Sequence, residues 1–272
     1  MGPVRRRSAV RRGWLLAAGL VVGCGETAGE SIEFSAAVLP VVGSAAGETS
    51  RAFVNARGWD IELDRAEVVL GPIYLHGGGR RAQLWLPSLV PVAYAHPADA
   101  TFDQGPPLGD ILDQHLVDLT DGAPSFLGTV FGLKGQLATL EVQIHPPGAA
   151  SPGSPEADLA SMGATSFALE GTARKDGTQL SFAAHGDLSE VASERVIGSI
   201  DADVALRDAE ERPGRLVIEI DVAEWFRQVD FSREHEVDER GRVRFPIGSP
   251  LGNALRWGIG SRFAYSARWS ES

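Results

Sequence analysis

The segment LATLEVQIH, at residues 137–145, alternates between polar and apolar side chains from Thr139 onward. Leu140, Val142 and Ile144 would lie on one side of an extended chain, and the polar residues between them on the other. Because successive side chains of a β-strand point to opposite faces, a period of two indicates a strand with one buried face. The segment therefore predicts a strand that packs on a core.

The same period recurs along much of the chain. Trp59, Ile61 and Leu63 alternate with acidic residues, and the apolar run at 68–75 is broken by Gly71-Pro72, which predicts a buried strand with a bend. Further alternating sets fall at residues 167–173, 180–184, 196–206, 216–222 and 263–269. Many short strands joined by Gly and Pro turns predict an all-β fold, mainly an antiparallel β-sandwich.

Two of these strands carry specific expectations. KDGT at residues 175–178 is typical of a hairpin turn. In the last strand, the alternation places Phe263, Tyr265, Ala267 and Trp269 on one face.

Helices are expected to be few, one or two and short. Asp221 with Glu224 resembles a capping box and predicts a helix containing Trp225 and Phe226. A second helix is expected at residues 250–257, whereas residues 109–121 fit a helix and a strand in part. Long loop insertions are expected at residues 77–109 and 145–163, both rich in proline.

The N-terminus has the three parts of an export signal. Five arginines and no acid precede the nine-residue apolar run WLLAAGLVV at residues 14–22. A membrane-spanning helix needs about 20 apolar residues, so this run is too short to be a permanent anchor. The pair Arg11-Arg12 also resembles a twin-arginine signal, although the general secretory route is favoured.

LVVGC at residues 20–24 resembles the lipobox of bacterial lipoproteins. The resemblance implies cleavage before Cys24, lipid attachment (diacylglycerol and palmitate) on its thiol, and a membrane as partner. Cys24 is the only cysteine of the chain and stands where a lipobox requires it. With Gly25 rather than aspartate after it, the resemblance implies the outer membrane, facing the periplasm or the cell surface. In general character the remainder resembles uncharacterised envelope lipoproteins, which implies no activity.

These observations predict a signal peptide at residues 1–23, a lipidated tether at 24–30 and one β-sandwich-like domain at 31–272. The chain has a formal charge of −11, and removal of the five signal arginines makes it −16. Such an acidic domain repels phosphate backbones, which argues against nucleic acid as a partner.

No motif of a known catalytic type stands out. There is no G-x-S-x-G elbow, no P-loop and no H-E-x-x-H in the sequence. A non-enzymatic binding module for a small ligand or an envelope partner protein is therefore the leading hypothesis. An envelope glycan hydrolase with dispersed carboxylates remains an alternative.

Histidines at strand ends suggest a second alternative, a periplasmic metal-binding protein. His76 and His96 flank the first proline-rich insertion, and His145 ends the strand quoted above. Imidazoles beside carboxylates such as Asp99 or Asp103 would suit zinc or copper as a cofactor. Surface or loop histidines without a ligand remain the simpler interpretation.

Two segments are candidates for partner binding. Trp85, Leu86, Tyr94 and Phe102 give the insertion at 84–102 a large apolar surface, which either folds back over the sheet or binds a partner. Residues 230–244 mix charges of both signs densely, which would suit a divalent cation or a partner protein. A solvated loop with internal ion pairs is the default expectation for this segment.

Overall fold

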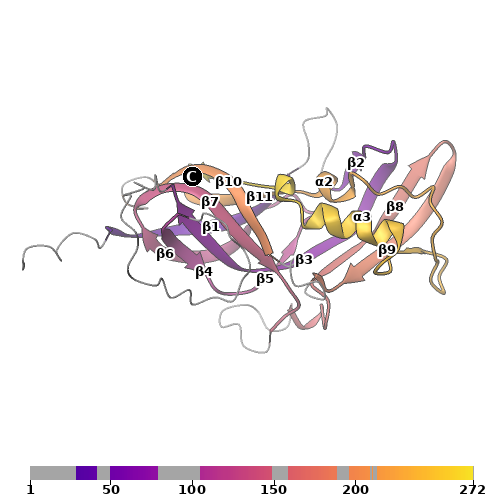
Figure 1. Ribbon diagram of the computed structural model, residues 1–272, viewed down its shortest axis with the longest axis horizontal. Helices are drawn as coiled ribbons and strands as arrows, with labels where there is room; N and C mark the ends of the chain where they lie inside the picture. Colours follow the sequence, from indigo (N-terminus) through magenta and orange to yellow (C-terminus); the bar gives the residue numbers. More distant parts are fainter. Residues whose placement is uncertain are drawn as a thin grey trace, which may run out of the picture. The chain divides into compact units, whose positions relative to one another are not determined.

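The computed structural model describes residues 29–41, 50–78, 105–148, 159–188, 196–208, 210 and 213–271. Its strands and helices are, in chain order, β1 (Ser31–Val41), β2 (Ala52–Val54), β3 (Asp60–Gly77), β4 (Pro107–Ile111), β5 (His115–Asp118), β6 (Ser125–Leu133), β7 (Gly135–Ile144), β8 (Phe167–Lys175), β9 (Thr178–Gly186), β10 (Val196–Leu206), β11 (Arg215–Asp221), α2 (Val222–Phe226), β12 (Val243–Arg244), α3 (Pro250–Ile259), the 3₁₀ turn η2 (Arg262–Ala264) and β13 (Tyr265–Ser270). Figure 1 labels most of them.

The long strand β3 belongs to two groups of strands. Its first half pairs with β2 and β8, and its second half with β4 and β7. Between the halves, Gly71-Pro72 interrupts the register, as the apolar run broken by this dipeptide predicted. One strand therefore connects two regions of the fold.

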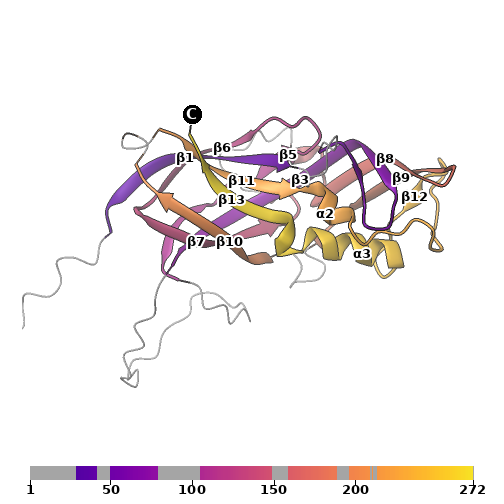
Figure 2. The same cartoon turned by 90° about the horizontal axis from the view of Figure 1, so that it is seen from above.

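The first region is a ring of eight strands, in the order β3-β4-β6-β1-β11-β13-β10-β7. It closes because β7 pairs back with β3. The pairs β1–β11 and β10–β13 are parallel, and the other neighbours are antiparallel. Figure 2 shows β6, β1, β11, β13, β10 and β7 following one another in this order. We call this region the strand ring.

The second region consists of the first half of β3 with β2, β8, β9 and β12, and we call it the side sheet. β8 and β9 form the predicted hairpin, whose turn residues Asp176 and Gly177 both have positive φ, at 50° and 79°. Positive φ at both central residues is the backbone of a type I′ hairpin turn. The outer strand β12 is only two residues long and pairs in parallel with β9.

The predicted all-β fold is confirmed, with two short helices as expected. Asp221 caps α2 by accepting from the backbone N–H of Ala223 at 3.0 Å, and Ser249 caps α3 by accepting from Gly252. Residues 109–121, which fitted both types, form parts of β4 and β5. Neither described helix has the length and apolar character needed to cross a membrane.

The expectation for the end of the chain is confirmed for three residues and wrong for one. Tyr265, Ala267 and Trp269 pack on the core, whereas Phe263 is 70 % exposed. β13 begins only at Tyr265, and Phe263 lies in the 3₁₀ turn before it, where strand alternation does not apply.

One hydrophobic core runs through both regions, but its composition changes. Inside the strand ring it is mainly aliphatic, with residues such as Leu140, Val142 and Ile218. Under the side sheet it contains a group of rings that we call the aromatic cluster: Phe53, Trp59, Phe182, Phe226, Phe231 and Phe245.

The helices cover this aromatic cluster and lie close to each other. A Cβ added at Gly258 of α3 would lie 2.2 Å from the carbonyl oxygen of Trp225 in α2. Only glycine therefore permits this distance between the helices. At the end of α3, the hydroxyl of Tyr265 donates to the carbonyl of Ile259 at 2.7 Å, which joins the helix to β13.

Candidate functional site

His76 lies near the end of β3, on the outer side of the strand ring. Its neighbours Leu75 and Gly77 are buried, and across the strands it faces Pro107 of β4 and Thr139 of β7. Tyr74 occupies the same side two residues earlier and faces Asp110 and Glu141. The structure thus places an imidazole near a phenol and two carboxylates.

The imidazole of His76 is poorly solvated. Both of its ring nitrogens are buried, and neither has a hydrogen-bond partner of standard geometry among the residues that the structure describes. Burial lowers the pKa of His76 below its usual 6.5, against the opposing effects of the Glu141 carboxylate and the Gly105 backbone. The ring is therefore neutral at pH 7, which is the state in which histidine binds metals.

His145 lies on the same side of β7 but far from His76. Gln114, which is buried, donates from Nε2 to His145 Nδ1 at 2.7 Å and accepts from the backbone N–H of Gly148 at 2.6 Å. Six residues separate His145 from Thr139, the partner of His76, and at about 3.3 Å per residue this is roughly 20 Å. His145 is thus held in a structural contact and cannot share an ion with His76.

The other predicted site residues lie outside the described residues: Cys24, Trp85, Leu86, Tyr94, His96 and Phe102. Within the described residues, no group of three or more His, Cys, Asp or Glu side chains could hold a metal ion. Of the histidines proposed as metal ligands, His76 and His145 are described, and only His76 remains a candidate.

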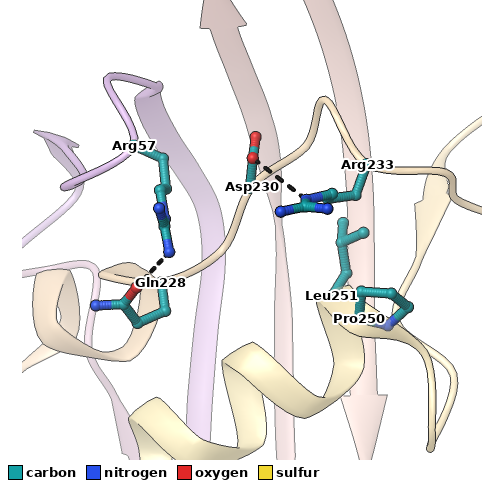
Figure 3. Close-up of a pocket in the computed structure, with 6 residues that line it drawn as sticks. All are labelled: Arg57, Gln228, Asp230, Arg233, Pro250 and Leu251. Atoms are coloured by element: carbon teal, nitrogen blue, oxygen red, sulfur yellow. Dashed lines mark hydrogen bonds and ion pairs between the residues drawn. The ribbon is translucent and has the colours of Figure 1, made fainter.

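Two depressions lie beside α3. The smaller one, of ≈ 180 Å³, is shown in Figure 3 and is lined by Arg57, Gln228, Asp230, Arg233, Pro250 and Leu251. Arg57 donates to Gln228 Oε1 at 2.7 Å, and Arg233 Nε lies 3.7 Å from Asp230 Oδ2. Asp230 also accepts from Trp59 and from Ser232. The polar groups that line the smaller depression thus already bind one another. Those of residues 230–244 do so as predicted for this charged loop.

The larger depression, of ≈ 320 Å³, lies between the end of β9 and α3, and we call it the β9–α3 depression. Its lining combines apolar and cationic side chains and consists of Phe167, Ala183, His185, Gly186, Asp187, Arg244, Phe245, Pro246, Ile247, Gly252, Leu255 and Arg256. Pockets of at least about 300 Å³ with apolar walls and a few convergent polar groups are typical ligand sites.

The origin of this depression lies in the end of β12. Val243 and Arg244 pair with Phe182 and Ala183 of β9, but Pro246 has no backbone N–H with which to continue the pairing. The chain leaves the sheet there and enters α3. Its carbonyl comes so near the helix that a Cβ added at Gly252 would lie 2.1 Å from Pro246 O. His185 and Gly186 of β9 therefore border the opening.

Two arginines give the depression its charge. Arg256 is only 5 % exposed, and its Nη2 donates to the carbonyl of Asp187 at 3.0 Å, which holds the guanidinium in the wall. The side chain of Arg244 is exposed and makes no hydrogen bond or ion pair with any part of the chain that the structure describes. By contrast, Arg242 pairs with Asp238 at 2.8 Å and with Glu170 at 2.9 Å.

Sequence reasoning did not identify this depression. Its two arginines come from β12 and α3, and tertiary structure alone brings β9 beside them. One signal was available: Arg256 lies beside Leu255 on the side of α3 that also carries Leu251 and Ile259. A charged residue in the apolar stripe of a helix is expected to be buried, and a buried charge usually has a partner or a functional role.

The hydrolase alternative requires two facing carboxylates. Among the described lining residues, each depression has a single carboxylate, Asp230 in the smaller and Asp187 in the larger. The described part of neither depression supplies such a pair.

No family model and no curated protein matches the chain. Among solved structures, MbnP from Methylosinus trichosporium is similar, with 12 % identity and a TM-score of 0.48. The similarity covers 89 % of this chain and 99 % of MbnP.

Proposed function

We propose that this chain is an exported, lipid-anchored envelope protein that binds a small ligand without transforming it. The observation that carries the binding role is the β9–α3 depression, where the cations of Arg244 and Arg256 meet the apolar side chains of Phe245 and Ile247. Apolar walls supply affinity, and a few fixed polar groups supply orientation. The lipid on Cys24 would hold this site at the membrane surface.

The binding role is tested with two probes of matched size, 1-octanol and octanoate, titrated into the protein carrying Cys24→Ala. At about 30 Å³ for each water-sized group, the depression has room for about ten such groups, close to the size of both probes. We expect saturable one-to-one binding of at least one probe by isothermal titration calorimetry. Absence of binding for both would overturn the assignment of this depression.

A matched pair of variants locates the binding. Ile247 lines the depression and is 59 % exposed, whereas Val54 of β2 is 56 % exposed and does not line it. Ile247→Asp should weaken binding of the probe, and Val54→Asp should leave it unchanged. Equal effects of the two substitutions would place the binding elsewhere.

The lipid anchor has a separate test. The Cys24→Ala protein, expressed in a bacterial host that processes lipoproteins, should keep its signal peptide and lose the lipid. Radiolabelled palmitate should be incorporated into the wild-type chain only. Incorporation into the Cys24→Ala chain would refute the lipoprotein assignment.

A second candidate function, metal binding, rests on His76. The two buried ring nitrogens of His76 have no partner in the described part of the chain, and a bound ion is one explanation for such unsatisfied polar atoms. The Glu141 carboxylate is close enough to affect the ring electrostatically, and imidazole with carboxylate suits zinc or copper.

This candidate is tested by titrating zinc and copper into the Cys24→Ala protein, which also removes the thiol as a competing ligand. His76→Ala should abolish stoichiometric binding, whereas His235→Ala, at a partly exposed histidine of the charged loop, should not. Metal bound equally well by the His76→Ala protein would reject His76 as a ligand.

A further inference from the structure

We propose that the ligand of the β9–α3 depression is an amphipathic monoanion, a carboxylate that carries a short apolar chain or ring. This inference rests on the proposed binding function and adds the chemical class of the ligand. It follows from three features of the depression: its charge, the geometry of its donors and its apolar wall.

The charge of the lining favours an anion. The described lining has two arginines and one aspartate, and His185 adds a further polar nitrogen group. The protein as a whole has a charge of −11, so a local excess of positive charge is contrary to its average surface. Because Arg256 is 95 % buried, its field is less screened than that of a surface arginine.

The donors favour a planar anion such as a carboxylate. A guanidinium presents its N–H groups in a planar fork that matches the two oxygens of a carboxylate. Arg244 is the last residue of β12 and pairs through its backbone with Ala183, so its Cα is fixed while its side chain has no partner in the described residues. A carboxylate at the opening would give this cation a counter-charge.

The apolar wall favours a single charged head with a short tail. Phe167, Phe245, Pro246, Ile247 and Leu255 form most of the remaining lining. A second charged group on the ligand would have to be placed against these side chains, at a desolvation cost that no described residue offsets. The space for about ten water-sized groups limits the tail to roughly the length of octanoate.

Three probes of equal chain length separate the charge from the tail: octanoate, 1-octanol and octylammonium. We expect octanoate to bind the Cys24→Ala protein at least tenfold more tightly than 1-octanol, since a hydrogen bond to an ionised group is roughly twice as strong as one between neutral groups. Acetate, which has the head without the tail, should bind more weakly than octanoate. Octanol binding as tightly as octanoate, or octylammonium binding more tightly, would overturn the proposed class while leaving a binding function in place.

Variants at arginines assign the effect to this site. Arg244→Gln should weaken octanoate about tenfold or more and leave octanol unchanged, and Arg244→Lys, which keeps the charge but not the fork, should lie between. The control is Arg240→Gln, at an exposed arginine of the same segment that does not line the depression. Because Arg244 is exposed, its substitution does not disturb the core. Unchanged octanoate affinity in Arg244→Gln would reject the proposal.

Discussion

The strand ring and the side sheet reach stability by different means. In the ring every strand has a neighbour on each side, and the enclosed side chains are mainly aliphatic. The side sheet ends in a two-residue strand, and it is supported instead by six aromatic rings and two helices. In the strand ring, closure gives the backbone N–H and C=O groups of every strand a neighbouring strand to pair with. In the side sheet, side-chain packing must compensate for an open edge. The β9–α3 depression lies at that open edge.

The largest test of this comparison removes the centre of the aromatic cluster. Phe182 contacts Phe226, Phe231 and Phe245 with ring centroids 5.6, 5.4 and 5.9 Å away. Phe182→Ala should lower the free energy of unfolding by about 3–5 kcal/mol, as is typical of buried aromatic truncation. Because one core cluster spans both regions, denaturant unfolding should remain a single transition by fluorescence and circular dichroism. Two separate transitions would show that the side sheet unfolds independently of the ring.

The next effect concerns the contact between the helices. Gly258→Ala would place a Cβ 2.2 Å from Trp225 O, so the helices must separate, at an expected cost of about 2–3 kcal/mol. Trp257→Ala is the neighbouring control: this side chain is 65 % exposed, and its loss should change stability by less than about 0.5 kcal/mol. If the thermal midpoints of the two variants were equal, close helix packing would not be what supports the side sheet.

A smaller effect is expected where the side sheet is tied to α2 by hydrogen bonds. Asn55 is buried, and its Nδ2 donates to the carbonyls of Phe226 and Val229 at 3.1 and 2.8 Å. Asn55→Ala leaves both carbonyls without this donor and should cost about 1–2 kcal/mol in urea denaturation. Asn253→Ala, at an exposed asparagine of α3, should cost less; the reverse order would contradict a buried role for Asn55.

Sequence reasoning predicted the individual strands far better than their arrangement. Alternation at 137–145 identified β7 because that signal is local. The parallel pairing of β1 with β11 joins Ser35 to Arg215, and closure of the ring rests partly on the single pairs Gly109–Gly132 and Ala202–Ala267. No local sequence pattern predicts such pairings, because they join segments that are far apart in the sequence and depend on the tertiary fold.

The candidate site shows the same limit. His76 was identified because it ends an apolar run. Strand alternation places its side chain outside the ring, so the burial of its ring nitrogens could not be predicted from the sequence. Arg244 and Arg256 meet the distant strand β9 because Pro246 ends the pairing of β12 and Gly252 lets the chain pass close to α3. The local effect of each of these residues can be predicted from the sequence, but their proximity depends on the tertiary fold.

The smallest expected effect tests the junction of the two regions. β5 pairs with the middle of β3, and burial lowers the pKa of its His115 below the usual 6.5, while Asp113 opposes the shift. The unfolded chain therefore takes up a proton at a pH where the folded chain does not, so this histidine removes stability as the pH falls below about 6.5, until the folded pKa is passed. His115→Gln should reduce the loss of stability between pH 7.5 and 5.5, measured by urea midpoints. Asp113→Asn should increase that loss, because it removes the charge that favours the protonated ring; opposite shifts in the two variants are required if burial at the junction is the cause.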